Sequence, residues 1–186
     1  MVVLQLTLNS IYGFDDFNIN FTYPKKIVNS FIESENLEGR ERFRYKKAVI
    51  LMGANATGKT SLGKALLRIF NYMANGNPIP LCEMVCGAKG SFSIDFVNGD
   101  NRLQRLTAEI VPNRNEVEIR YQDAEIGVLD SYEKCVAKLQ DRTAEVIETA
   151  TALKKRVGEV RCRFAYPEIE KSLKLTKTNQ AILLKT

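Results

Sequence analysis

The stretch of sequence that decides the fold is residues 53–60, GANATGKT. It fits the pattern G-x-x-x-x-G-K-[ST], in which glycines let the backbone close around phosphate groups with successive N–H groups pointing inward. Lys59 can then reach the outer phosphates, and the hydroxyl of Thr60 can ligate Mg²⁺. A helix beginning here would add the positive end of its dipole. The stretch therefore predicts a phosphate-binding loop, against the plainer alternative of a glycine turn that binds nothing.

The residues on either side indicate the strand and the helix that this pattern requires. Residues 48–52, AVILM, form a short apolar run, which is typical of a buried parallel strand. Downstream, the sequence NGNP at 75–78 predicts the end of a helix. Between the loop and that stop, apolar residues recur at helical spacing on one face: Leu62, Ala65, Leu66, Ile69, Phe70 and Met73.

The third position of the loop is Asn55, and Ser61 follows the pattern. With these residues the loop resembles that of the ATP-binding cassette (ABC) superfamily, especially its soluble branch of SMC-, RecF- and OLD-like proteins. The longer stretch 53–66, GANATGKTSLGKAL, is similar to bacterial AAA-type ATP-binding proteins of that branch, many of which belong to defence or abortive-infection systems.

The resemblance implies ATP and Mg²⁺ as cofactors. Lys59 would act in catalysis, and Thr60 would bind the metal. In the complete protein, ATP hydrolysis would be coupled to the dimerisation of heads, as a homodimer or with another ABC-type head, in a DNA-related or anti-phage defence ATPase. Further expected partners are a nuclease or other effector subunit and nucleic acid. We expect no contact with a membrane. The residues expected to hold the nucleotide are Gly53, Ala54, Asn55, Ala56, Thr57, Gly58, Lys59, Thr60 and Ser61.

Before the loop, residues 3–9 and 17–21 alternate between apolar and polar side chains, which predicts two half-buried strands in a hairpin. The turn between them, residues 10–14, lies where RecF- and SMC-like heads have a short turn with a basic residue. Tyr12 stands in place of that residue. Its ring either stacks on adenine or packs within the protein.

Residues 24–47 separate this hairpin from the loop. Within them, residues 27–32 predict a short helix, and residues 33–47 are highly charged and predict an exposed loop. Such a spacer is common in the AAA-type branch and unusual in transporter cassettes.

Residues 91–129 predict an antiparallel meander, which resembles the β-subdomain beside the nucleotide in ABC heads. Alternating side chains and turn residues define it. The strands are expected at 91–96, 102–111, 116–121 and 126–129, with turns at 98–100, 112–115 and 122–125.

The next segment predicts a long helix. Asp130 can cap it, and Glu133 closes a capping box. Apolar residues then alternate at spacings of four and three, which at about 1.5 Å per residue predicts a helix of roughly 40 Å. That helix either lies on the domain or forms the first leg of a helical arm, as in SMC-like proteins. Its stripe comprises Tyr132, Val136, Leu139, Thr143, Val146, Ala150, Leu153, Val157 and Val160.

These patterns predict an α/β fold: an ABC-type P-loop NTPase head lobe with an antiparallel β-subdomain and a long helical segment. We expect an N-terminal lobe at 1–129, a helical arm or insertion at 130–175, and the start of a truncated following element at 176–186. Gln180 falls where the family's Q-loop glutamine would contact Mg²⁺, unless it is an ordinary strand-edge residue.

A complete ABC ATPase also needs a strand ending in Asp-Glu, an LSGG-like signature and usually a switch histidine. The 186 residues contain none of these, and in this family they follow the helical insertion, so we interpret the chain as an N-terminal lobe. Three other functions stay open: a small P-loop kinase of a metabolite, which the antiparallel meander disfavours, a non-hydrolysing nucleotide-binding scaffold, and a transporter cassette.

The composition, 45% hydrophobic and 26% charged, is ordinary for a globular protein. No apolar run approaches about 18 residues, and the N-terminus lacks signal-peptide features, so we expect a cytoplasmic protein. The net charge of +5 permits contact with nucleic acid, although the charges are scattered and solvated faces explain them as well. Four cysteines, at 82, 86, 135 and 162, fit free thiols in a reducing compartment; without histidine, a zinc site would lack ligands.

Overall fold

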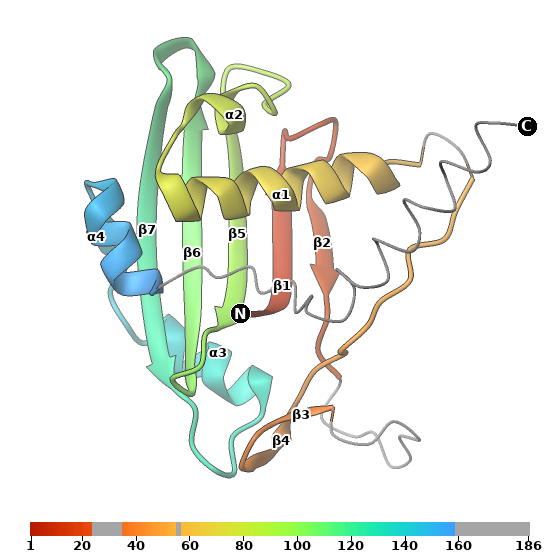
Figure 1. Cartoon of the computed structure of the whole chain (residues 1–186), viewed down its shortest axis with the longest axis vertical. Helices are drawn as coiled ribbons and strands as arrows, with labels where there is room; N and C mark the ends of the chain where they lie inside the picture. Colours follow the sequence, from red (N-terminus) through yellow and green to blue (C-terminus); the bar gives the residue numbers. More distant parts are fainter. Residues whose placement is uncertain (24–34, 55–56, 159–186) are drawn as a thin grey trace, which may run out of the picture.

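The structure of the chain is a computed structural model that describes residues 1–23, 35–54 and 57–158. Its centre is a six-stranded sheet with the strand order β2-β1-β5-β6-β7-β8, in which each neighbouring pair is antiparallel (Figure 1). A separate two-stranded hairpin lies below one end of it. The sheet strands are β1 (Val2–Asn9), β2 (Phe17–Asn20), β5 (Gly90–Val97), β6 (Arg102–Val111), β7 (Glu116–Glu125) and β8 (Glu145–Ile147); the hairpin is β3 (Asn36–Leu37) and β4 (Arg40–Arg44).

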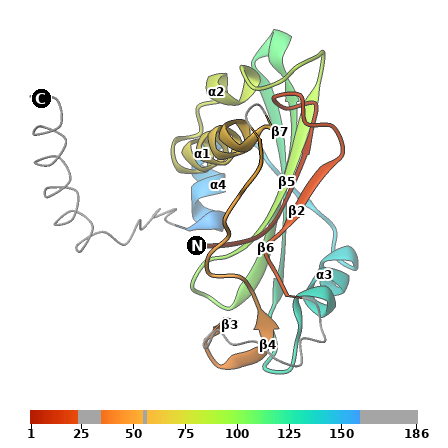
Figure 2. The ribbon, with the colours of Figure 1, turned by 90° about the vertical axis from the view of Figure 1, so that its right-hand side faces the viewer.

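Four α-helices within the described residues complete this mixed α/β fold. They are α1 (Lys59–Asn75), α2 (Ile79–Cys82), α3 (Tyr132–Gln140) and α4 (Ala150–Val157). Figure 2 shows α1, α2 and α4 on one face of the sheet and α3 on the other. None of the helices in the described ranges has the length and apolarity that crossing a lipid bilayer requires.

The main core lies between α1 and the sheet. The apolar stripe of α1 contributes Leu62, Ala65, Ile69 and Met73, all of which are buried. Alternating side chains of β1, β5, β6 and β7 face this stripe, and Leu153 and Val157 of α4 join them. Because fully burying one large apolar side chain contributes about 1.5–3 kcal/mol, this contact fixes α1 on the sheet.

A smaller core lies on the opposite face, under α3 and the β3–β4 hairpin. A register shift in β1 between Val3 and Gln5 accompanies the placement of Leu4 in this second core, where Phe43 of β4 joins it. An ion pair borders it, in which the partly exposed Arg105 donates two hydrogen bonds of 2.7 Å to the buried Asp95. The Tyr132 hydroxyl donates to Asp95 as well, so that α3 is attached to the sheet. Burial and the neighbouring Asp95 raise the pKa of Tyr132, which keeps its hydroxyl protonated as a donor.

Several predicted elements are confirmed. The N-terminal hairpin is β1 and β2, and the meander strands at 91–96, 102–111 and 116–121 are β5, β6 and β7. The predicted helix after the loop is α1. It ends at Gly76, which adopts a left-handed conformation with φ 73°.

The predicted end of the meander was wrong. Residues 122–125 do not turn, because β7 continues to Glu125 and pairs with β6 along its whole length. Residues 126–129 form no strand; the strand that follows β7 in the sheet is β8.

The single long helix was also wrong. Residues 141–149 interrupt it with a turn and with β8, whose Ile147 is buried beside Ile119 of β7. The Gln122 amide donates hydrogen bonds to the carbonyls of Leu139 and Arg142, which stabilises the end of α3. β-branched Val146 and Ile147 suit a strand better than a helix. Residues 132–157 therefore pack onto the sheet as separate short elements.

The apolar run at 48–52 is not the predicted buried parallel strand. It pairs with none of the described strands, and its side chains alternate in exposure, with Val49 42%, Ile50 84%, Leu51 44% and Met52 88% exposed. A strand needs a neighbour to accept its hydrogen bonds. Val49 lines a pocket with Val2 and Val3 of β1, but residues 48–52 form no ladder with that strand or with any other described strand.

The charged stretch 33–47 is more ordered than predicted. Within the described part, residues 35–47 contain the β3–β4 hairpin and the buried residues Glu35 and Phe43. The predicted helix at 27–32, and also Asn55, Ala56, Cys162 and Gln180, lie outside the described residues.

The cap of α3 differs from the prediction. Ser131 is the N-cap and accepts a hydrogen bond from the Lys134 N–H, whereas the buried Asp130 carboxylate accepts from the Gly127 N–H and from the side chains of Lys134 and Lys138. Hydrogen bonds from Lys134, then Lys138, hold the pKa of Asp130 well below its ordinary value. Ionised Asp130 therefore stabilises the folded state.

Because the folded pKa is the lower one, this stability is present above the unfolded pKa and is lost as pH falls through the folded pKa. We expect Asp130→Asn to lower the free energy of unfolding at neutral pH by about 1–3 kcal/mol. The difference from the parent should shrink below about pH 4. Urea titrations across pH measure it, with Asp141→Asn on the exposed end of α3 as the matched control. A difference independent of pH would contradict the assignment.

Candidate functional site

The glycine loop lies at the start of α1, and its lysine is turned onto the loop. The Lys59 ammonium donates to the carbonyl oxygens of Gly53 at 2.7 Å and Ala54 at 2.6 Å, and to the Thr57 hydroxyl at 3.1 Å. The Thr57 hydroxyl donates in turn to the Ala54 carbonyl. The positive charge is therefore held at the mouth of the loop.

Gly58 gives the loop its shape. It adopts φ 85°, in the left-handed region that favours glycine. A side chain at this position would also meet the ring of Phe14 at 2.9 Å. Both backbone conformation and space therefore require glycine at this point of the pattern.

The first turn of α1 has no side-chain cap among the described residues. No side chain caps it at Gly58, and it contains no acidic residue. By contrast, hydroxyls cap α3 and α4, at Ser131 and Thr149. The opening N–H groups of a helix have no partner within the helix and lie at its positive end. The start of α1 therefore has the electrostatics of an anion-binding site.

The turn after β1 brings aromatic rings to the loop. Ser10, Tyr12 and Asp16 all have positive φ, near 50°, which is uncommon for residues other than glycine. The turn is held from α2 and the residues after it, because the Tyr12 N–H donates to the Met84 carbonyl and the Cys86 N–H donates to the Ser10 carbonyl. This strained conformation places Phe14 against Gly58.

A cavity of about 260 Å³ opens beside the loop. Phe14 and Phe17 form one wall, with ring centroids 4.6 Å apart. Gly53, Thr57, Gly58 and Lys59 line the cavity from the loop, with Leu51, Met52 and Leu62 beside them. None of these lining residues is acidic, so no carboxylate competes with an anion here.

The structure brings together part of the predicted site. Gly53, Thr57, Gly58 and Lys59 line the cavity, the exposed Thr60 lies in the first turn of α1, and Ser61 follows it, half-buried. Within the described residues, no group of three or more acidic residues or cysteines is placed to hold a metal ion.

Tyr12 is absent from the lining of this cavity. The guanidinium of Arg68 lies 5.7 Å from the centre of the Tyr12 ring, which corresponds to the alternative of packing within the protein. The aromatic residues at the cavity are Phe14 and Phe17, which the sequence analysis missed as site residues. The available signal was their position, in and just after the turn that precedes the second strand.

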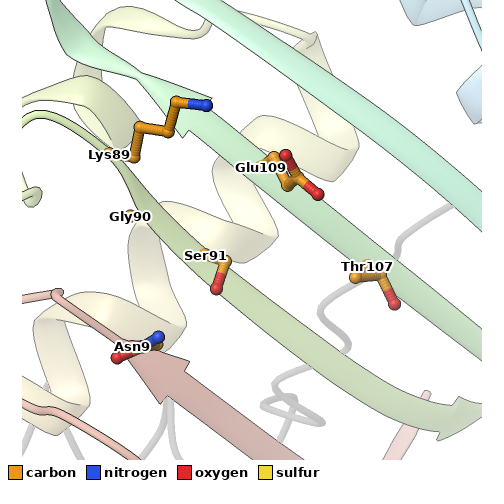
Figure 3. A pocket seen from close by; sticks show the side chains of 6 residues that line it. All are labelled: Asn9, Lys89, Gly90, Ser91, Thr107 and Glu109. Atoms are coloured by element: carbon orange, nitrogen blue, oxygen red, sulfur yellow. The ribbon is translucent and has the colours of Figure 1, made fainter.

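A second cavity, of about 270 Å³, lies on the other face of the sheet (Figure 3). Asn9 of β1, Ser91 of β5 and Thr107 and Glu109 of β6 line it, together with Lys89 and Gly90 at the start of β5. The carboxylate of Glu109 disfavours an anion at this place. The loop cavity is therefore the better candidate for a phosphate ligand.

Comparison with known proteins assigns no family to the chain: no protein-family model matches it, and a search of curated proteins finds no significant match. Functional inference accordingly rests on the loop, the cavity and their chemistry.

The contact between Gly58 and Phe14 gives a direct test of the loop geometry. We expect Gly58→Ala to lower the free energy of unfolding by about 1–2 kcal/mol through the left-handed backbone alone, and by more through overlap with Phe14. In a Phe14→Ala background the overlap disappears, so the two changes should couple by at least about 0.5 kcal/mol. Urea unfolding of the four proteins measures this coupling. Strict additivity would show that Phe14 does not pack on the loop.

Proposed function

We propose that residues 53–61 bind the phosphates of ATP and that Thr60 ligates the accompanying Mg²⁺. The observation that carries this proposal is the convergence of the Lys59 ammonium and the uncapped start of α1 on the mouth of one glycine loop. Among the described residues, no carboxylate forms an ion pair with Lys59, and the first turn of α1 contains no acidic residue.

Binding would exchange the partners of Lys59. Its present acceptors are two neutral carbonyls and a hydroxyl. An anionic phosphate oxygen adds the attraction between opposite charges to a hydrogen bond of the same donor. Phosphate oxygens would therefore draw the ammonium from the loop. Mg²⁺ usually takes one or two protein ligands together with phosphate oxygens and water. The Thr60 hydroxyl would be one such ligand, and we propose Gln180 as the second.

The aromatic wall suits the nucleoside part of the ligand. Phe14 and Phe17 face the cavity beside the loop, and aromatic faces stack on nucleobases. We propose that these rings take the role first considered for Tyr12.

We further propose that the chain is a lobe of an ABC-type ATPase head, in which an antiparallel sheet flanks the helix after the loop. The sheet order β2-β1-β5-β6-β7 beside α1 supports this architecture. The complete protein would hydrolyse ATP as a dimer of heads, in a DNA-related or anti-phage defence system with an effector such as a nuclease.

Replacing the loop lysine tests nucleotide binding. Lys59→Ala removes a charge-assisted contact, typically about 1.5–3 kcal/mol, so we expect affinity for Mg-ATP to fall at least about tenfold. Titration calorimetry measures it. Lys64→Ala, which removes an exposed lysine from the same helix, should bind as the parent does. Equal affinity of the Lys59 variant and the parent would refute the site.

Catalysis is expected to be negligible in residues 1–186 alone. Hydrolysis needs an oriented water and stabilisation of the transferring phosphoryl group, and the residues that line the loop cavity include no carboxylate. Lys59 and Thr60 would supply mainly ground-state binding, which does not accelerate the chemical step. The test is phosphate release by the purified chain, with Lys59→Ala as the contamination control. Robust release that the variant abolishes would place the catalytic acid within this chain.

A further inference from the structure

A strip of basic side chains runs along β4 and the residues after it. It consists of Arg42, Arg44, Lys46 and Lys47. Side chains at alternate positions of an extended strand share a face and lie about 6.4–6.8 Å apart, so that Arg42, Arg44 and Lys46 form one row. Phe43, between two of them, is fully buried on the other side in the second core. The burial of Phe43 therefore anchors the strand that carries this row to the second core.

The strip is rigid where it meets the end of β2. The Tyr23 N–H donates to the Arg44 carbonyl, and the Lys46 N–H donates to the Phe21 carbonyl at 2.7 Å. The Arg44 guanidinium and the Lys46 ammonium both approach the ring of Tyr23, at 5.4 and 5.9 Å from its centre. Two cations on one ring confirm that Arg44 and Lys46 extend to the same side.

Among the residues that the structure describes, the side chains of the strip have no ion-pair partner. None of the ion pairs among the described residues includes Arg42, Arg44, Lys46 or Lys47. The nearby Glu35 is buried, and its carboxylate accepts a hydrogen bond from the Lys47 backbone N–H rather than from a side chain of the strip. Glu38 and Glu41 are exposed, but neither pairs with these cations. The strip thus presents a surface that attracts a polyanion.

An apolar pocket adjoins the strip. It has a volume of about 310 Å³, and Lys46 and Lys47 line it together with Phe21, Tyr45, Val49 and Phe70. This volume lies at the low end for ligand sites and suits one flat apolar group. A pocket that joins aromatic side chains to lysines fits a ligand that is apolar at one end and anionic at the other.

We propose that the strip and its pocket bind single-stranded nucleic acid, with backbone phosphates along Arg42, Arg44, Lys46 and Lys47 and one base in the pocket. A duplex keeps its bases stacked inside, so only an unpaired strand can offer a base to the pocket. An anionic membrane would match the charges, but the apolar groups here are concave rather than protruding. No residue lines both this pocket and the loop cavity, so the site is separate from the proposed ATP site.

The test is fluorescence anisotropy with a labelled oligothymidylate of about 12 nucleotides, titrated with the protein at several salt concentrations. We expect the double variant Lys46→Gln/Lys47→Gln to bind about tenfold more weakly. Its slope of log affinity against log salt should be shallower by about 1.4, because each phosphate contact on a single strand contributes about 0.7. Lys154→Gln/Lys155→Gln, the same charge change on exposed residues of α4, should bind as the parent does.

Two further measurements leave the strip unchanged: one changes the oligonucleotide, and the other changes the glycine loop. An abasic strand of equal length should bind several-fold more weakly than oligothymidylate, and Lys59→Ala should leave oligonucleotide binding unchanged. Equal loss in the two lysine pairs, or equal binding of the abasic strand, would overturn the proposal. Binding of phosphatidylserine vesicles without binding of the oligonucleotide would overturn it in favour of a membrane surface.

Discussion

The contact of α1 with the sheet is the interaction on which the rest of the structure depends. The buried stripe of α1 fixes the axis of the helix and therefore the position of the glycine loop at its start. At its other end, Gly76 closes so tightly against Ala150 of α4 that a side chain there would overlap it. The same sheet carries the turn that brings Phe14 to the loop. One packed interface thus places the loop, the turn and the cavity relative to one another.

A strained turn lies against a glycine loop that carries a positive charge. Glycine at position 58 is required both by its left-handed backbone and by the neighbouring ring of Phe14. The turn opposite contains three residues other than glycine with positive φ. Strain of this kind persists only where the surroundings enforce it, and it clusters at functional sites. The Lys59 ammonium donates to two carbonyls and a hydroxyl, all of them neutral. A phosphate would offer it a negatively charged acceptor.

Most regular elements follow from local patterns, since alternation along β1, β5 and β6 and the apolar stripe of α1 are properties of neighbouring residues. The misses depend on distant partners. Val146 continues the heptad stripe, but it and Ile147 pair with the edge of β7. Residues 48–52 have the composition of a strand but pair with no described strand. The helix after the glycine loop could be predicted because its apolar stripe and its end depend on neighbouring residues. The contact of Phe14 with Gly58 could not be predicted, because only the folded turn brings the two residues together.

The most direct measurement of the central claim is the change in backbone amide chemical shifts when Mg-ATP is added to the labelled chain. Nucleotide bound at the loop should move the amides of residues 57–61 most, with smaller shifts at Phe14 and Phe17. Residues of β6 that face the opposite side, such as Thr107 and Glu109, should remain unmoved. Shifts confined to that opposite face, or no shifts at saturating nucleotide, would contradict the account.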